Sequence, residues 1–81
     1  MKTLNHIRTF SSISTQNDAT NIANRQILHA NRDNWRAIQF EVSSNRENTN
    51  NGVIEIHHVT VLFEKTLDKN GENNITEFPE I

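Results

Sequence analysis

The spacing of hydrophobic positions changes along this chain, and the changes predict four elements. Residues 2–10 alternate weakly between apolar and polar side chains, which favours a short strand. In residues 16–35 apolar residues recur every three or four positions, as on one face of a helix. Residues 37–46 and 53–66 are predicted strands, and both contain β-branched and aromatic side chains. The predicted order is therefore β-α-β-β.

The predicted helix has a start signal and a narrow apolar face. Ser and Thr side chains in residues 11–15 can accept the free N–H groups of a first turn, and a carboxylate at Asp18 favours the helix dipole. Leu28 and Trp35 form a second stripe, and we expect Trp35 to be a core or subunit-contact residue. The main apolar face is small enough to lie close to a sheet, and it consists of Ala19, Ile22, Ala23, Ile27 and Ala30.

A hairpin is predicted where Asn50, Asn51 and Gly52 separate the last two strands. Asn-Gly is a strong hairpin signal because both residues tolerate positive φ. We therefore expect an α+β fold, with one long helix packed on a three-stranded antiparallel sheet. Residues 1–66 would form this single domain, and residues 67–81 a polar C-terminal tail. In strand 53–66 alternation puts Val59, Val61 and Phe63 on one face and Ile56, His58, Thr60 and Leu62 on the other.

Size and composition favour a homo-oligomer. The chain has 81 residues, a third of them hydrophobic, and no cysteine. A domain of this size buries a modest fraction of its surface and is marginally stable alone. Both faces of strand 53–66 are largely apolar, whereas one helix can cover one face. We therefore expect a second copy of the chain to complete the core.

The charge pattern excludes several classes of partner. The net charge is -2, and the basic residues form neither a stripe for nucleic acid nor a basic amphipathic face for a membrane. No apolar run approaches the length of a membrane span. The first six residues lack the hydrophobic region of a signal peptide, so we expect a cytoplasmic protein.

The sequence contains no motif that indicates catalysis. There is no nucleophile elbow, no paired-carboxylate constellation and no phosphate-binding glycine loop. His57 and His58 are adjacent on a predicted strand, so their rings point to opposite faces and cannot chelate one metal ion. We therefore expect neither an enzyme nor a metal site.

Several short motifs follow one another at a definite spacing: Ser11-Ser12, Asp18-Ala19, Phe40-Glu41-Val42, Arg46, Asn51-Gly52 and Val59-Thr60. Their order and spacing resemble the dodecins, a family of small flavin-binding β-α-β-β proteins that assemble into hollow dodecamers. From Phe40 to Thr60 the match needs no gap. The helix region needs about three extra residues, and the tail exceeds the usual family ending.

The resemblance implies two cofactor-binding positions, and both carry other residues here. Dodecins stack the flavin ring on a Trp, and the matching position is Gln39. They bind the flavin edge with a Gln, and the matching position is His58. Gln39 offers a small amide face in place of an aromatic plane, whereas His58 can both donate and accept a hydrogen bond.

Two functional hypotheses follow. In the first, the protein is a non-enzymatic, dodecin-like homo-oligomer that binds or stores a flavin (FMN or riboflavin) or a similar planar small molecule. In the second, the same fold is a small protein–protein interaction module, an inhibitor or adaptor without a cofactor. The absent Trp at Gln39 favours the second, and the gapless match from Phe40 to Thr60 favours the first.

Overall fold

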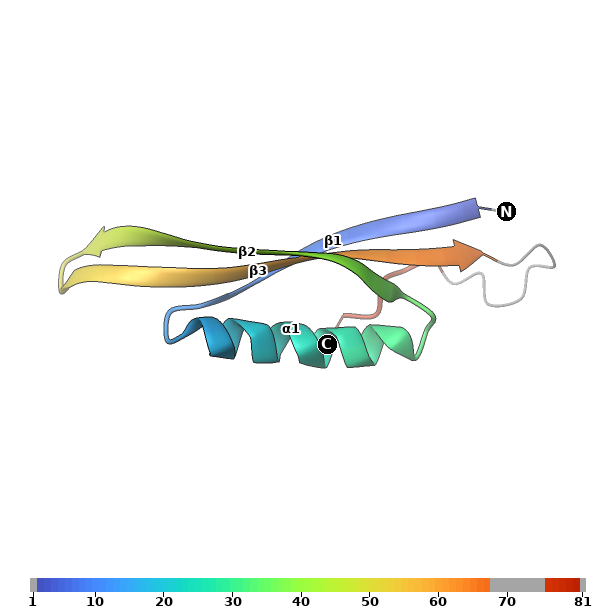
Figure 1. Ribbon diagram of the computed structural model, residues 1–81, viewed down its shortest axis with the longest axis horizontal. Coiled ribbons are helices and arrows are strands. Elements are labelled where there is room, and N and C mark those ends of the chain that lie inside the picture. Colours follow the sequence, from blue (N-terminus) through green and yellow to red (C-terminus); the bar gives the residue numbers. More distant parts are fainter. Residues whose placement is uncertain (1, 68–75, 81) are drawn as a thin grey trace.

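One helix lies against one face of a three-stranded antiparallel sheet in the computed structural model, which describes residues 2–67 and 76–80 (Figure 1). The strand order is β1-β3-β2, so the last strand is central. This confirms the α+β fold and the predicted element order. The elements are β1 (Lys2–Ser12), α1 (Gln16–Asn31), β2 (Arg36–Thr49) and β3 (Gly52–Leu67).

The β2–β3 hairpin extends beyond the rest of the sheet. β1 stops pairing at Ser12, which lies opposite His57 of β3. β2 continues to pair with β3 as far as Thr49, opposite Gly52. The end of the hairpin is therefore a two-stranded arm that projects past α1 (Figure 1), and the molecule measures 56 × 18 × 17 Å.

β1 and β2 are longer than the alternation predicts. β1 continues two residues past the expected end at residue 10, and β2 continues past residue 46 to Thr49. The added residues are polar, and Thr49 alone among them has a high intrinsic strand preference. They are extended because each pairs with β3: Ser11 and Ser12 lie opposite His58 and His57, and residues 47–49 lie opposite Ile54, Val53 and Gly52. Pairing outweighs the local preference here.

Side-chain and backbone caps set both ends of α1. The Thr15 hydroxyl accepts a hydrogen bond from the Asp18 N–H at 3.1 Å, as the Ser/Thr cluster predicted. At the other end Asn34 has φ 66, and the Trp35 N–H donates to the Ala30 carbonyl at 3.1 Å. This is a Schellman ending, for which Asn is tolerated in the left-handed region. The helix thus ends at Asn31, and the expected continuation to Trp35 is wrong.

The core lies between α1 and the β1–β3 half of the sheet. Trp35 and Phe63 are its largest fully buried side chains, so Trp35 is a core residue. The helix face differs from the predicted one at two positions, since Gln26 is buried and Ile22 is 42% exposed. The buried apolar residues are Phe10, Ala19, Ala23, Ala30, Trp35, Val59, Val61 and Phe63.

Part of the expected polar tail packs on this core. The Phe78 ring stacks on His6 at 4.1 Å and contacts Phe63 at 4.7 Å between ring centroids. The Gln26 amide donates to the Pro79 carbonyl at 2.8 Å, and a Glu80 oxygen lies 3.3 Å from the Arg8 Nε. Residues 76–80 therefore contact both α1 and the sheet. Residues 68–75 of the predicted tail lie outside the described residues.

The hairpin turn follows the Asn-Gly signal, with the reversal one residue earlier than the dipeptide. Asn50 and Asn51 form the turn, and Gly52 begins β3 with φ 116. The Thr49 hydroxyl supports it by accepting from the Asn51 N–H at 3.2 Å and donating to the Gly52 carbonyl at 2.8 Å. Glycine is favoured here because of the positive φ. Space is not the reason, since a Cβ on Gly52 would have no neighbour within 4 Å.

Replacing this glycine by valine should destabilise the fold. We expect Gly52→Val to lower the free energy of unfolding by about 1–3 kcal/mol, the scale of a residue forced into a sparsely populated backbone region. Urea unfolding measures it. Asn48→Val is the matched control, since it adds the same side chain to an exposed strand position of the same hairpin. Equal losses for both variants would contradict a backbone origin.

Loss of the Phe78 ring should also destabilise the domain. We expect Phe78→Ala to lower the unfolding free energy by about 1.5–3 kcal/mol, because the ring is partly buried against the core. Thermal unfolding by circular dichroism reports the change. The neighbouring Glu77 is exposed, so Glu77→Ala should melt like the wild type. An unchanged melting temperature for Phe78→Ala would show that residues 76–80 do not belong to the folded domain.

Candidate functional site

The sheet face opposite α1, here called the open face, carries both residues that the resemblance singled out. Gln39 lies opposite Leu62 of β3, and His58 lies opposite Ser43 of β2. Residues 58 and 62 of β3 share a face by alternation, so Gln39 and His58 do as well. They stand four positions apart along β3, roughly 14 Å. The sheet therefore brings them to one surface without bringing them into contact.

A hollow of about 150 Å³ lies on the open face at Gln39. Ile7 of β1 and Leu62 of β3 give it an aliphatic floor, and Gln39 and Glu41 give it polar groups. Its further lining residues are Phe40 and Thr60. His58 does not line it, so the two predicted site residues belong to different parts of the face.

The His58 ring is held by hydrogen bonds across all three strands. Its Nδ1 lies 2.7 Å from the Ser11 hydroxyl of β1, and its Nε2 lies 2.5 Å from the Asn45 Oδ1 of β2. An amide oxygen can only accept, so Nε2 carries the proton in the neutral ring. Nδ1 then accepts from Ser11. Both ring nitrogens are thus engaged, and a ligand that bonds to His58 must replace one of these partners.

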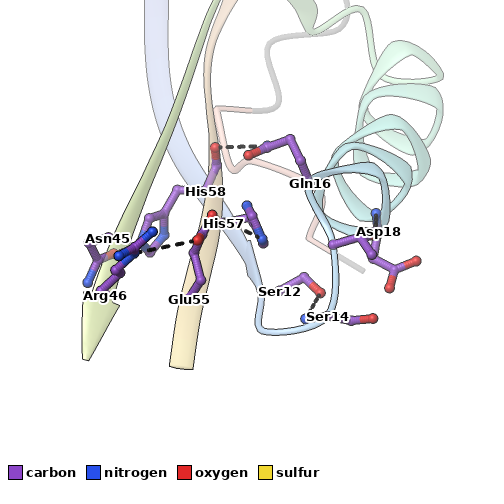
Figure 2. Close-up of polar contacts among 10 residues, drawn as sticks. Ser12, Ser14, Gln16, Asp18, Asn45, Arg46, Glu55, His57 and His58 are labelled. Carbon is purple, nitrogen blue, oxygen red and sulfur yellow. Dashed lines mark hydrogen bonds and ion pairs between the residues drawn. The ribbon is translucent and has the colours of Figure 1, made fainter. Parts of the chain in front are cut away.

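His57 faces the other way, as its position next to His58 predicted. Figure 2 shows the two rings on opposite sides of β3, with Gln16 of α1 reaching the His58 carbonyl at 3.3 Å. The His57 Nε2 lies 3.7 Å from Glu55, which also lies 3.8 Å from the Arg46 Nε. Within residues 2–67 and 76–80, no three His, Cys, Asp or Glu side chains are grouped to hold a metal ion.

The open face has a predominantly acidic set of charges. Glu41 and Glu47 project from β2 and Glu64 from β3. Arg36 is on the same face and lies 3.5 Å from Glu64. The other basic residues of the described strands lie on the α1 side. An anion on the open face would therefore be repelled unless another chain brought positive charge.

Ser11 and Asn45 were missed as site residues by sequence reasoning. Nothing local marks them, since each is one of many polar residues in an extended segment. Their contact with His58 depends on the register of β1 and β2 against β3, which joins positions far apart in sequence. The hollow likewise depends on Ile7 and Leu62 meeting across two strands.

Comparison with known proteins adds no relative. No family model matches the chain, and neither the curated proteins nor the solved structures contain a match to it. In the described part of the chain, no helix has the length and apolar character needed to cross a membrane. The candidate site is therefore defined by its own geometry.

The tautomer of His58 gives a direct test of the hydrogen bonds on the open face. We expect the Nε2–H form to dominate in mildly alkaline buffer, because Asn45 Oδ1 accepts from that nitrogen. Long-range ¹H–¹⁵N correlation spectra of the imidazole distinguish the two tautomers. Asn45→Ala should shift the population towards Nδ1–H, whereas Asn48→Ala, further along the same strand, should not. A dominant Nδ1–H form in the wild type would contradict the assigned network.

Proposed function

We propose that the protein is a non-enzymatic, cytoplasmic homo-oligomer that holds a planar small molecule of the flavin type (riboflavin or FMN) on its open face. The observation that carries the proposal is the position of Gln39. The residue that corresponds to the stacking Trp of the dodecins lines a hollow, and that hollow has an aliphatic floor of Ile7 and Leu62. A planar ring can rest on such a floor with its polar edge at Gln39.

The size of the hollow supports assembly as part of this function. Ligand pockets usually enclose about 300–1,000 Å³, and the hollow measures about 150 Å³. One chain therefore supplies one wall, and a second copy must supply the other. A dodecamer is the subunit number that the resemblance suggests.

His58 has a limited part in the proposed site. Its ring already bonds Ser11 and Asn45, and it stands roughly 14 Å from Gln39 along β3. A flavin seated at Gln39 would reach it only with one end. We therefore assign the binding energy mainly to the hollow, and to His58 a polar contact that exchanges with one of its present partners.

A second candidate, a protein–protein interaction module, is supported by the exposed edge of the sheet. Phe40 is 56% exposed and Val42 is 60% exposed, although both lie on the α1 side of the sheet. They are exposed because β2 is an edge strand and α1 covers the β1–β3 half of the sheet. Large apolar side chains at a free strand edge suit association with another chain. Such a module would keep this surface and bind no planar ligand.

Restoring an aromatic ring at position 39 tests the ligand. We expect Gln39→Trp to tighten riboflavin binding by about 0.5–1.5 kcal/mol, the range for added aromatic stacking. Quenching of flavin fluorescence on titration measures the affinity. Ser43→Trp is the control, because residue 43 is on the same strand and face but outside the hollow. If neither the wild type nor Gln39→Trp quenches the fluorescence, flavin binding is excluded and the interaction module is favoured.

A further inference from the structure

The outer surface of α1 carries a stripe that nothing in the described chain covers. Arg25, Leu28 and Arg32 are spaced by three and four residues, so they lie along one side of the helix. All three are exposed, and Leu28 is 68% exposed. Within residues 2–67 and 76–80, neither arginine has an ion-pair partner. A large apolar side chain flanked by two cations is thus presented to solvent.

The open face presents the opposite arrangement. Leu62 of β3 lines the hollow. Along β3, Glu64 is two positions from Leu62 in one direction, and Thr60, which lies opposite Glu41, is two positions away in the other. Here two carboxylates flank an apolar depression. Glu41 has no ion-pair partner among the described residues, and Glu64 contacts Arg36 at a distance of 3.5 Å.

The two surfaces also match in length. Arg32, the C-cap residue of α1, is seven positions beyond Arg25 and keeps helical backbone angles, so the two are roughly 10.5 Å apart along the axis. Four strand positions separate Glu41 from Glu64, which is roughly 14 Å. Arginine side chains are long enough to make up the difference. Leu28 lies between the two arginines, and Leu62 lies between the two glutamates. The two leucines therefore come into contact when each arginine pairs with a glutamate.

We propose that α1 of a second copy docks on the open face, with its Leu28 in the hollow and its Arg25 and Arg32 against Glu41 and Glu64. The contact cannot form within one chain, because α1 and the open face lie on opposite sides of the sheet (Figure 1). The charge complementarity selects a second copy as the occupant. It also explains how the uncovered face of the sheet is protected from water.

The contact joins two different surfaces, so every copy offers one of each. Such a head-to-tail interface produces a closed ring when the rotation closes, and an open filament when it does not. The interface needs no ligand and goes beyond the proposed function in this respect. If a planar molecule occupies the hollow, the second copy's Leu28 becomes the second wall, and that detail rests on the proposed function.

Charge reversal with rescue tests the contact. We expect Arg25→Glu/Arg32→Glu to raise the dissociation constant of self-association by roughly tenfold or more, since like charges would then face each other. Glu41→Arg/Glu64→Arg should do the same. In a mixture of the two variants, both contacts between unlike copies pair opposite charges, so mixing should restore association as alternating hetero-oligomers. Sedimentation velocity at micromolar concentration measures all four samples, and circular dichroism melting shows that each variant is folded.

An apolar substitution with a matched control complements the reversal. Leu28→Ser should weaken association without lowering the melting temperature, because the side chain is exposed in the single chain. Ile13 is 69% exposed and lies outside both surfaces, so Ile13→Ser should leave association unchanged. If Glu64→Arg unfolds the chain by repelling Arg36, Glu41→Arg alone replaces the double variant.

Each remaining outcome overturns the contact. The proposed contact is wrong if the wild type stays monomeric. It is also wrong if the wild type forms an oligomer that Arg25→Glu/Arg32→Glu leaves intact. Weakening without rescue in the mixture shows that α1 docks on another surface. Riboflavin titration is a separate measurement: absence of quenching with intact reversal and rescue rejects the planar ligand and retains the contact.

Discussion

The close packing of α1 on the sheet is the constraint on which the rest of the structure depends. Ala19, Ala23 and Ala30 are almost completely buried, and the valines and Phe63 of β3 lie against them. Small side chains let the helix approach the sheet closely, and residues 2–67 and 76–80 contain one helix to use in this way. One helix covers the β1–β3 half of one face. The open face and the edge residues of β2 are left in water for that reason, and these are the surfaces on which a ligand or another chain can act.

The parts of the fold that local chemistry determines could be predicted from the sequence. The Thr15 cap and the Asn-Gly turn use short-range hydrogen bonds and a positive φ at Gly52, which a few residues encode. The end of α1 could not be placed, because Asn34 is one of many asparagines and its left-handed conformation is supported by burial of Trp35 beyond it. The packing of Phe78 was missed for a related reason. It depends on a gap between distant elements and leaves no periodic signal in a polar segment.

In the candidate site, too, local features could be predicted from the sequence, and features that depend on distant contacts could not. Alternation along β3 correctly separated His57 from His58, since it is a local property. The face of Gln39 is different, because it depends on a bulge at Ile38 that shifts the register between Ala37 and Gln39. Without the extra residue Gln39 would share the face of Ala37 and point towards α1, as a one-residue slip reverses every side chain. The resemblance to the dodecins suggested Gln39 as a ligand position, and the bulge is what directs this residue to the open face.

Electrostatics links the two proposals. On a single chain, the hollow lies beside Glu41 and near Glu64, so a neutral ring is accepted more easily than a ligand with a phosphate. In the proposed contact, Arg25 and Arg32 of the second copy bring two positive charges to this acidic face and offset that repulsion. Both ligands would then need the second wall that assembly supplies, and FMN would in addition need the positive charges of the second copy. Assembly and ligand choice would thus be coupled through the same four charged side chains, with the shape of the hollow determining only that the ligand is flat.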